Sequence, residues 1–241
     1  MTRATALRRQ LITALCVVGV FSHAWAAEPS LEGVWKLASS SGQLVPVDGE
    51  PVPFTEPGRM AYAANKAAAA RNDYSFDPTS TGCASPGQPR LMLSPESFVV
   101  FQRPRMVTIL YAWNRLFRQI NVGKPLKNPL LPATYADFPT RQGYAEGRWE
   151  ANTLVVKTTG FSEEKLLDDF LPNSDQLELS ERIRLRSPEL LEDRITIKDP
   201  KMYRRAWDAL LTYRRQADNE FPFAEDVCLD RLAAKQPPLR R

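Results

Sequence analysis

Hydrophobic and polar residues alternate with a period of two in most of the chain from residue 98 onward. Strands that bury one face have this pattern, because successive side chains point to opposite sides. With proline, glycine and asparagine at the boundaries, it predicts nine strands over residues 31–37, 98–102, 106–113, 116–121, 144–150, 153–159, 177–185, 191–198 and 206–213. Residues 45–54 carry an Asp48-Gly49 turn signal but three prolines, so we expect at best an edge ribbon there.

Two segments have helical patterns. Met60–Arg71 is rich in alanine, the strongest helix former, and follows Pro57-Gly58. Phe161–Phe170 predicts a second, short helix, with Ser162 as its N-cap and two glutamates in its first turn. Residues 77–95 and 125–139 are rich in proline and are predicted to be loops.

The predicted fold class is mainly β, with two short helices. Short connections join most of the strands, which favours antiparallel neighbours and therefore a meander. Nine strands in about 200 residues usually close into a barrel or stack as a sandwich. The strand pattern resumes after the 125–139 loop, so we expect one domain over residues 27–230 and a flexible basic tail over 231–241.

The first 26 residues have the three parts of a signal peptide. Three arginines precede the apolar stretch Leu11–Phe21, and Ala24-Trp25-Ala26 is a small-x-small cleavage site. An eleven-residue helix spans about 16 Å, roughly half of a hydrocarbon core, so we expect no integral membrane anchor. The protein is predicted to be periplasmic or secreted.

Composition excludes several classes. A chain of 241 residues with 43% hydrophobic and 25% charged residues is neither disordered, nor a coiled coil, nor a polytopic membrane protein. Without the three arginines of the signal peptide, 29 basic residues face 28 acidic ones, which gives no support for nucleic-acid binding.

Removing the signal peptide leaves two cysteines, Cys83 and Cys228, and no histidine. In an oxidising compartment two cysteines predict one disulfide, with two separate buried thiols as the alternative. The lack of histidine excludes Ser-His-Asp and Cys-His catalysis and histidine-ligated metals. The acidic residues near 163–175 fit no calcium loop, so we expect no metal and no cofactor.

Alternation also predicts a charged pair inside the sheet. In residues 177–185 the even positions are all polar, and the odd positions are leucine or isoleucine except for Glu181. Arg118 likewise stands between Leu116 and Ile120 at a period of two. Because an unpaired buried carboxylate is costly, we expect Glu181 and Arg118 to pair in the interior. The pair is either a polar anchor or acid/base in a ligand cavity, or a structural ion pair of the core.

The Gly33-x-Trp35 pair resembles the opening of lipocalin-type barrels, in which the tryptophan closes the barrel floor. A wider resemblance extends over roughly residues 55–230. Its motifs are Asp77-Pro78, C-x-x-P-G-x-P-R over 83–90, G-R-W-E-x-x-T-L-V-V over 147–156, Glu181-Arg182, Asp199-Pro200 and Cys228. In this order they resemble a family of uncharacterised secreted bacterial proteins.

That resemblance implies a compartment, a β-rich fold and the cysteine pair, but no activity. The family has histidines at the positions of Tyr144 and Asn173, and Asp-Gly-Arg where this chain has Val122-Gly123-Lys124. Any role of those histidines in relatives is therefore lost or changed here.

Three functions remain open. The first is a periplasmic or secreted barrel that binds a small, largely apolar ligand. Its candidate ligand-binding residues are Trp35, Tyr111, Trp113, Arg118, Arg148, Glu181 and Trp207. The second is a histidine-free acid/base enzyme of isomerase, cyclase or lyase type, with Glu181 as base and Tyr144 or Arg118 stabilising negative charge. The third is a non-catalytic envelope interaction protein with a filled core.

Overall fold

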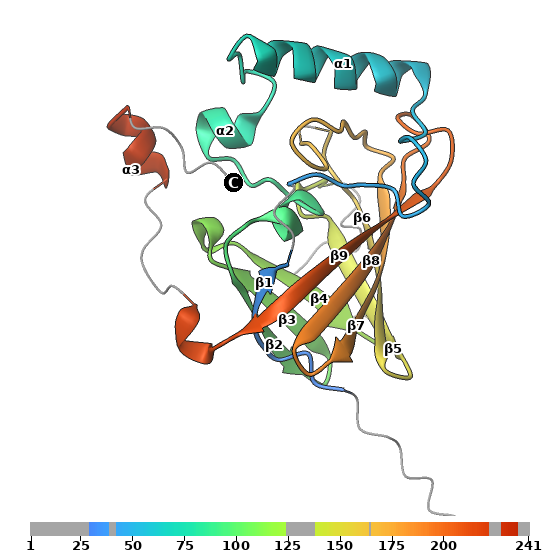
Figure 1. Ribbon diagram of the computed structural model, residues 1–241, viewed down its shortest axis with the longest axis vertical. Helices are drawn as coiled ribbons and strands as arrows, with labels where there is room; N and C mark the ends of the chain where they lie inside the picture. The colour runs from blue at the N-terminus through green and yellow to red at the C-terminus, as the bar shows by residue number, and fades with distance from the viewer. Residues whose placement is uncertain (1–28, 39–41, 124–137, 164, 222–227, 236–241) are drawn as a thin grey trace, which may run out of the picture.

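Nine strands form one closed barrel (Figure 1). The computed structural model describes residues 29–38, 42–123, 138–163, 165–221 and 228–235. The strands are β1 Gly33–Leu37, β2 Phe98–Arg103, β3 Met106–Tyr111, β4 Phe117–Val122, β5 Tyr144–Glu150, β6 Thr153–Thr159, β7 Glu178–Ser187, β8 Leu190–Lys198 and β9 Trp207–Gln216. The mainly-β prediction is confirmed, and of the two predicted architectures, barrel and sandwich, the structure is the barrel.

One neighbouring pair, β4 with β5, is parallel, so the prediction of an antiparallel meander is wrong at this point. The reason is the odd number of strands. Strands that alternate in direction cannot close a ring of nine without at least one parallel pair. Parallel neighbours need a crossover of about a dozen residues or more. The predicted 125–139 loop is long enough, and most of it lies outside the described residues.

An arginine of β9 stacks on the tryptophan of β1. The Arg215 guanidinium lies 4.3 Å from the centroid of the Trp35 ring, and the Trp35 indole N–H donates to the Leu31 carbonyl over 3.0 Å. Gly33 has φ +139°, and the Arg215 guanidinium occupies the space that a Cβ at this position would need. The backbone conformation favours glycine here, because other residues rarely adopt a φ of this value.

The described residues include three α-helices, and two of them lie at one end of the barrel (Figure 1). They are α1 Glu56–Ala70, α2 Pro78–Gly82 and α3 Cys228–Ala233, with the short 3-10 turns η1 Arg90–Leu93, η2 Trp113–Arg115 and η4 Asp218–Glu220. The predicted alanine-rich helix is α1. It begins before Pro57, because Thr55 caps it and proline is tolerated in a first turn. None of these helices is long and apolar enough to cross a membrane.

The helix predicted over Phe161–Phe170 is wrong, since its described residues are irregular. The Asp168 carboxylate accepts hydrogen bonds from the backbone N–H groups of Phe170 and Leu171, both over 2.8 Å. A side chain that binds nearby backbone in this way competes with helix formation. In the described structure the Ser162 hydroxyl has no hydrogen-bond partner, so it caps nothing.

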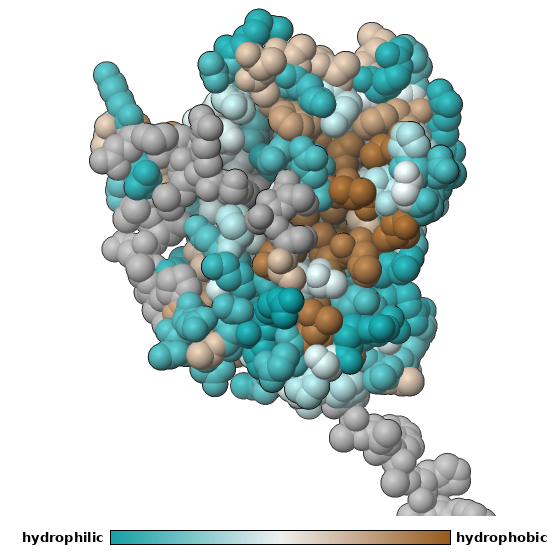
Figure 2. Space-filling model, in the orientation of Figure 1, coloured by the Kyte–Doolittle hydropathy of each residue, from teal (hydrophilic) through white to brown (hydrophobic). Residues whose placement is uncertain are grey.

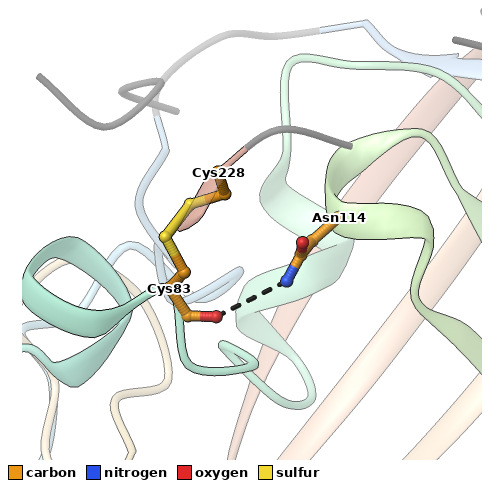
Figure 3. Close-up of a disulfide and its surroundings, with 3 residues drawn as sticks. All are labelled: Cys83, Asn114 and Cys228. Atoms are coloured by element: carbon orange, nitrogen blue, oxygen red, sulfur yellow. Dashed lines mark hydrogen bonds between the residues drawn. A yellow bond between two sulfur atoms is a disulfide. The ribbon is translucent and has the colours of Figure 1, made fainter. Parts of the chain in front are cut away.

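The predicted disulfide is confirmed (Figure 3). Cys83, just after α2, is bonded to Cys228 at the start of α3, across 145 residues of sequence. The Cys83 carbonyl also accepts a hydrogen bond from the Asn114 side-chain amide over 3.4 Å. The disulfide fixes α3, which runs three residues into the predicted flexible tail, to the loop that covers the barrel.

Hydrophilic residues cover most of the face shown in Figure 2, with hydrophobic residues gathered near its centre. The predicted edge ribbon is present only as single bridges, one of which pairs Pro46 with Ala209 of β9. This bridge places the exposed Val45 opposite the exposed Leu210 on the outer wall of the barrel.

Candidate functional site

Arg118 and Glu181 form an ion pair inside the barrel, as strand alternation predicts. Arg118 Nη1 donates to Glu181 Oε1 over 2.8 Å, and Nη2 donates to Oε2, so the pair is bidentate. Arg118 Nη2 also donates to the Thr158 hydroxyl over 2.9 Å. The two charged side chains are 2% and 1% exposed. They come from β4 and β7, and β6, which pairs with β7, carries Thr158.

Asp193 adds a second carboxyl to this cluster and was not predicted from the sequence. It lies on β8 opposite Ile183 of β7 and Leu211 of β9, and it is fully buried. Within the described structure, neither oxygen of its carboxyl group has a hydrogen-bond partner. The same alternation could have found it, because residues 191, 195 and 197 of this strand are leucine or isoleucine.

The pKa of Asp193 is raised by its surroundings. Burial raises the pKa of Asp193 well above its ordinary value, and the negative charge of Glu181 raises it further. Arg118 opposes these effects but is already paired with Glu181. The raised pKa favours the neutral, protonated form of Asp193, as expected for one of two carboxyl groups in one buried site.

Three buried aromatic rings belong to the same core as these carboxyl groups. The Phe98 ring centroid lies 5.0 Å from that of Tyr213, edge to face, and 5.8 Å from that of Tyr111. Burial raises the pKa of both tyrosines, and the negative charge of Glu181 raises it further. Both phenols are therefore neutral, and the interior combines ring surfaces with two carboxyl groups and one guanidinium.

The segment that contains the P-G-x-P-R motif covers this cluster. Tyr111 donates its hydroxyl to Met92 Sδ over 2.8 Å, and Tyr213 donates to the Met92 carbonyl over 3.2 Å. Gln88 Nε2 donates to the Tyr111 hydroxyl over 3.2 Å. We call residues 87–93 the cover segment. All of its residues are buried, so it closes this end of the interior.

A buried ion pair anchors the cover segment to the loop before it. Arg90 donates to both carboxylate oxygens of Asp77, over 2.7 and 2.8 Å. Burial opposes ionisation, but these bonds and the charge of Arg90 lower the pKa of Asp77 to about 2. The Asp-Pro and P-G-x-P-R motifs are therefore two halves of one contact.

Lys165 holds the cover segment from the other side. Its ammonium donates to the Gln88 carbonyl over 2.6 Å and lies 4.6 Å from the centroid of the Phe161 ring. Burial lowers the pKa of Lys165 to about 7, against the opposing effect of Asp199. This lysine was not among the predicted site residues, because the irregular segment that turns it inward was predicted to be a helix.

Several buried polar atoms lack a hydrogen-bond partner among the described residues. Besides both oxygens of Asp193, they include Gln88 Oε1, Gln142 Nε2, Asn173 Oδ1 and Trp207 Nε1. Buried polar groups in native proteins are usually paired with protein, water or ligand. The covered end of the barrel therefore has unused donors and acceptors.

The structure does not bring all the predicted site residues together. Trp35, Tyr111, Trp113 and Trp207 are all buried. Arg148 lies outside the barrel, with its side chain 65% exposed and bonded to Glu150 over 2.6 Å. Tyr144 lies an even number of residues from Arg148 on β5, so it points to the same side of the sheet. Its hydroxyl donates to the Phe138 carbonyl over 2.7 Å. Because Ala145 and Gly147 fill the inward positions of β5, neither residue reaches Glu181 from this strand.

Fold and site define a closed β-barrel with a covered, charged interior. No protein-family model matches the chain, and no curated protein sequence matches it. Among solved structures, a mutant of the fluorescent protein UnaG is similar, with a TM-score of 0.34 and 11% sequence identity over 78% of this chain and 96% of that chain. A likeness at this level establishes neither a shared fold nor a shared ligand, and the barrel assignment rests on the strand pairings.

Proposed function

We propose that the barrel binds a small, largely apolar molecule in its interior, with Arg118, Glu181 and Asp193 as the polar anchor. The observation that carries this proposal is Asp193, a fully buried carboxyl that the described residues leave without a donor. Replacing buried ionic groups by apolar residues is often neutral or stabilising, so a filled core gains little from three of them. Groups of this kind cluster where proteins contact ligands.

The walls around the anchor support a largely apolar ligand. The inward side chains next to it along the strands are Ile120, Val156, Ile183, Ile195 and Leu211, all buried. Apolar walls with a few convergent polar groups are typical of small-molecule sites. The ligand would lie between these walls and beneath the cover segment.

The proposed compartment is the periplasm or the cell exterior. The disulfide supports this proposal, because disulfides persist in oxidising environments. The predicted signal peptide, residues 1–26, lies outside the described residues.

Native mass spectrometry of the mature protein, purified without a denaturing step, tests ligand binding. We expect an added mass that disappears on denaturation. Ala209→Leu should abolish it, because residue 209 is 1% exposed and faces the interior, where a larger side chain takes ligand space. Leu210→Ala is the matched control on the outer face and should keep it. A wild-type protein without added mass contradicts the proposal whether or not the variant folds.

Two carboxyl groups buried in one interior, Asp193 and Glu181, favour a second candidate, the histidine-free acid/base enzyme. Glu181 would be the base, and Arg118 would stabilise negative charge. The phenols inside the barrel are those of Tyr111 and Tyr213, and not that of Tyr144. In this case Glu181→Gln should stop exchange of carbon-bound hydrogen of the bound molecule with D2O. Exchange at the wild-type rate would remove Glu181 from the role of base.

A further inference from the structure

We infer that the polar end of the ligand is an ammonium group, so that the barrel takes small apolar amines with their nitrogen between Asp193 and the neighbouring aromatic rings. This inference rests on the proposed ligand-binding function and names the chemical class of the ligand. Two independent features support it: the charge balance of the buried cluster and the aromatic rings that surround it.

The cluster contains one cation for two acids. Arg118 donates to both oxygens of Glu181 and to the Thr158 hydroxyl. Asp193 has no ion pair within the described part of the chain, although it is fully buried. The raised pKa of Asp193 favours its neutral form and so reduces this imbalance. A bound ammonium would supply the missing cation and up to three N–H donors for oxygens that have none.

Five groups interact electrostatically with Asp193, and Glu181 and Arg118 among them belong to the same charged cluster. They are Glu181 on β7, Arg118 on β4, Glu192 on β8, Tyr111 on β3 and Tyr213 on β9. Glu192 has its own cations, because it pairs with Arg184 over 2.7 Å on the outer face. The Asp193–Glu181 pair is therefore the one pair of acids, among these groups, that shares a single cation.

Aromatic rings next to a carboxylate are a recurring arrangement for binding ammonium groups, because ring faces attract cations. Phe98, Tyr111 and Tyr213 are all buried, and the Phe98 ring contacts both tyrosine rings. The register of β8 with β9 places Tyr213 two residues along its strand from Leu211, which lies opposite Asp193.

Other polar ends fit this cluster less well. A carboxylate would face Glu181 and Asp193 while the single guanidinium is already engaged by two bonds. An alcohol would leave the charge balance unchanged and would gain only neutral hydrogen bonds. The expected order of affinity is therefore amine, then alcohol, then carboxylate.

Amine binding has a defined proton balance. The amine enters as R–NH3+ and Asp193 starts as a neutral carboxyl group. On binding, the Asp193 O–H bond breaks, its proton passes to solvent, and R–NH3+ pairs with the resulting carboxylate. We therefore expect about one proton released for each amine bound at neutral pH, and none for an alcohol.

The experiment is isothermal titration of the whole mature protein, after removal of any co-purified ligand, with n-octylamine, n-octanol and n-octanoate. Titrations in phosphate and in Tris separate proton release from the binding heat. We expect octylamine to bind at least about ten-fold more tightly than octanol, a preference of about 1.4 kcal/mol. Asp193→Asn should remove this preference and the proton release, while leaving octanol binding within about two-fold.

Asp208→Asn is the matched control, because Asp208 lies on β9 and pairs with Arg194 outside the barrel. It should leave all three affinities and the proton release unchanged. Equal or tighter binding of octanol or octanoate, octylamine binding without proton release, or no octylamine binding would each overturn the inference. The wild-type titrations decide this even if Asp193→Asn fails to fold.

The two proposals fail differently. If native mass spectrometry finds a bound molecule without a basic nitrogen, or if octanol binds as tightly as octylamine, the barrel binds ligands but the amine class is wrong. If no molecule co-purifies and none of the three probes binds, the ligand-binding function itself is wrong.

Discussion

Replacing Arg118 by methionine should destabilise the protein strongly. The change removes both hydrogen bonds to Glu181 and the one to Thr158, and it leaves Glu181 without a cation at 1% exposure. Removing one partner of a buried ion pair costs about 3–5 kcal/mol. For a domain of this size each kcal/mol lowers Tm by about 2–4 °C, so we expect a decrease of roughly 6–20 °C.

The double variant Arg118→Met/Glu181→Leu provides the comparison that tests the reasoning. It removes both charges together, and an apolar pair in place of a buried ion pair is often neutral or stabilising. We therefore expect it to recover most of the stability that the single variant loses. The assay is urea unfolding followed by tryptophan fluorescence, with the disulfide kept oxidised and a two-state transition verified by a second probe.

Two results would refute the reasoning. A loss below about 1 kcal/mol in the single variant would show that Glu181 has another source of stabilisation. The double variant could also lose as much unfolding free energy as Arg118→Met and Glu181→Leu lose together. That result would show that the two residues do not act as a pair.

Three further changes have defined outcomes. For Lys165, the folded pKa of about 7 lies below the ordinary 10.5, so its contribution to stability is full above pH 10.5 and is lost as the pH falls to 7. The wild type should therefore become more stable between pH 7 and 10, and this gain should be absent in Lys165→Met. Urea unfolding at both pH values measures it. For Asp77, the folded pKa of about 2 lies below the ordinary 3.8, so its contribution to stability is present above pH 3.8 and is lost as the pH falls through 2. Asp77→Asn should therefore flatten the acid unfolding curve in this range. An unchanged curve would contradict the pairing with Arg90. Replacing both Cys83 and Cys228 by alanine should lower the unfolding free energy by at most roughly 5 kcal/mol, measured against the oxidised wild type, and dithiothreitol should not destabilise the variant further.

Strand alternation was enough to predict most of the fold and the central ion pair. It placed Arg118 and Glu181 among apolar neighbours at a period of two, and both side chains are inside the barrel. The same rule applied to β8 would have predicted Asp193, whose inward neighbours Leu191 and Ile195 are apolar. On β5 the rule separates the polar residues Tyr144 and Arg148 from the interior, and glycine and alanine mark the inward face.

The errors have physical causes that local patterns do not contain. The parallel β4–β5 pair follows from closing a ring of nine strands, a property of the whole sheet. The missing helix at Phe161–Phe170 follows from tertiary contacts. Asp168 binds the backbone of Leu44, over 100 residues away in sequence, and Lys165 is held by the Gln88 carbonyl. Such contacts override a favourable N-cap and first turn.

The central claim is that the charged cluster inside the barrel binds a ligand. A crystal structure of the protein purified without ligand removal tests it most directly. We expect electron density for a molecule inside the barrel, with a polar atom within about 3 Å of the Asp193 carboxyl group. An interior filled by the protein's own side chains, with Asp193 bonded to Glu181 alone, would contradict the claim and leave the cluster as a structural element of the core.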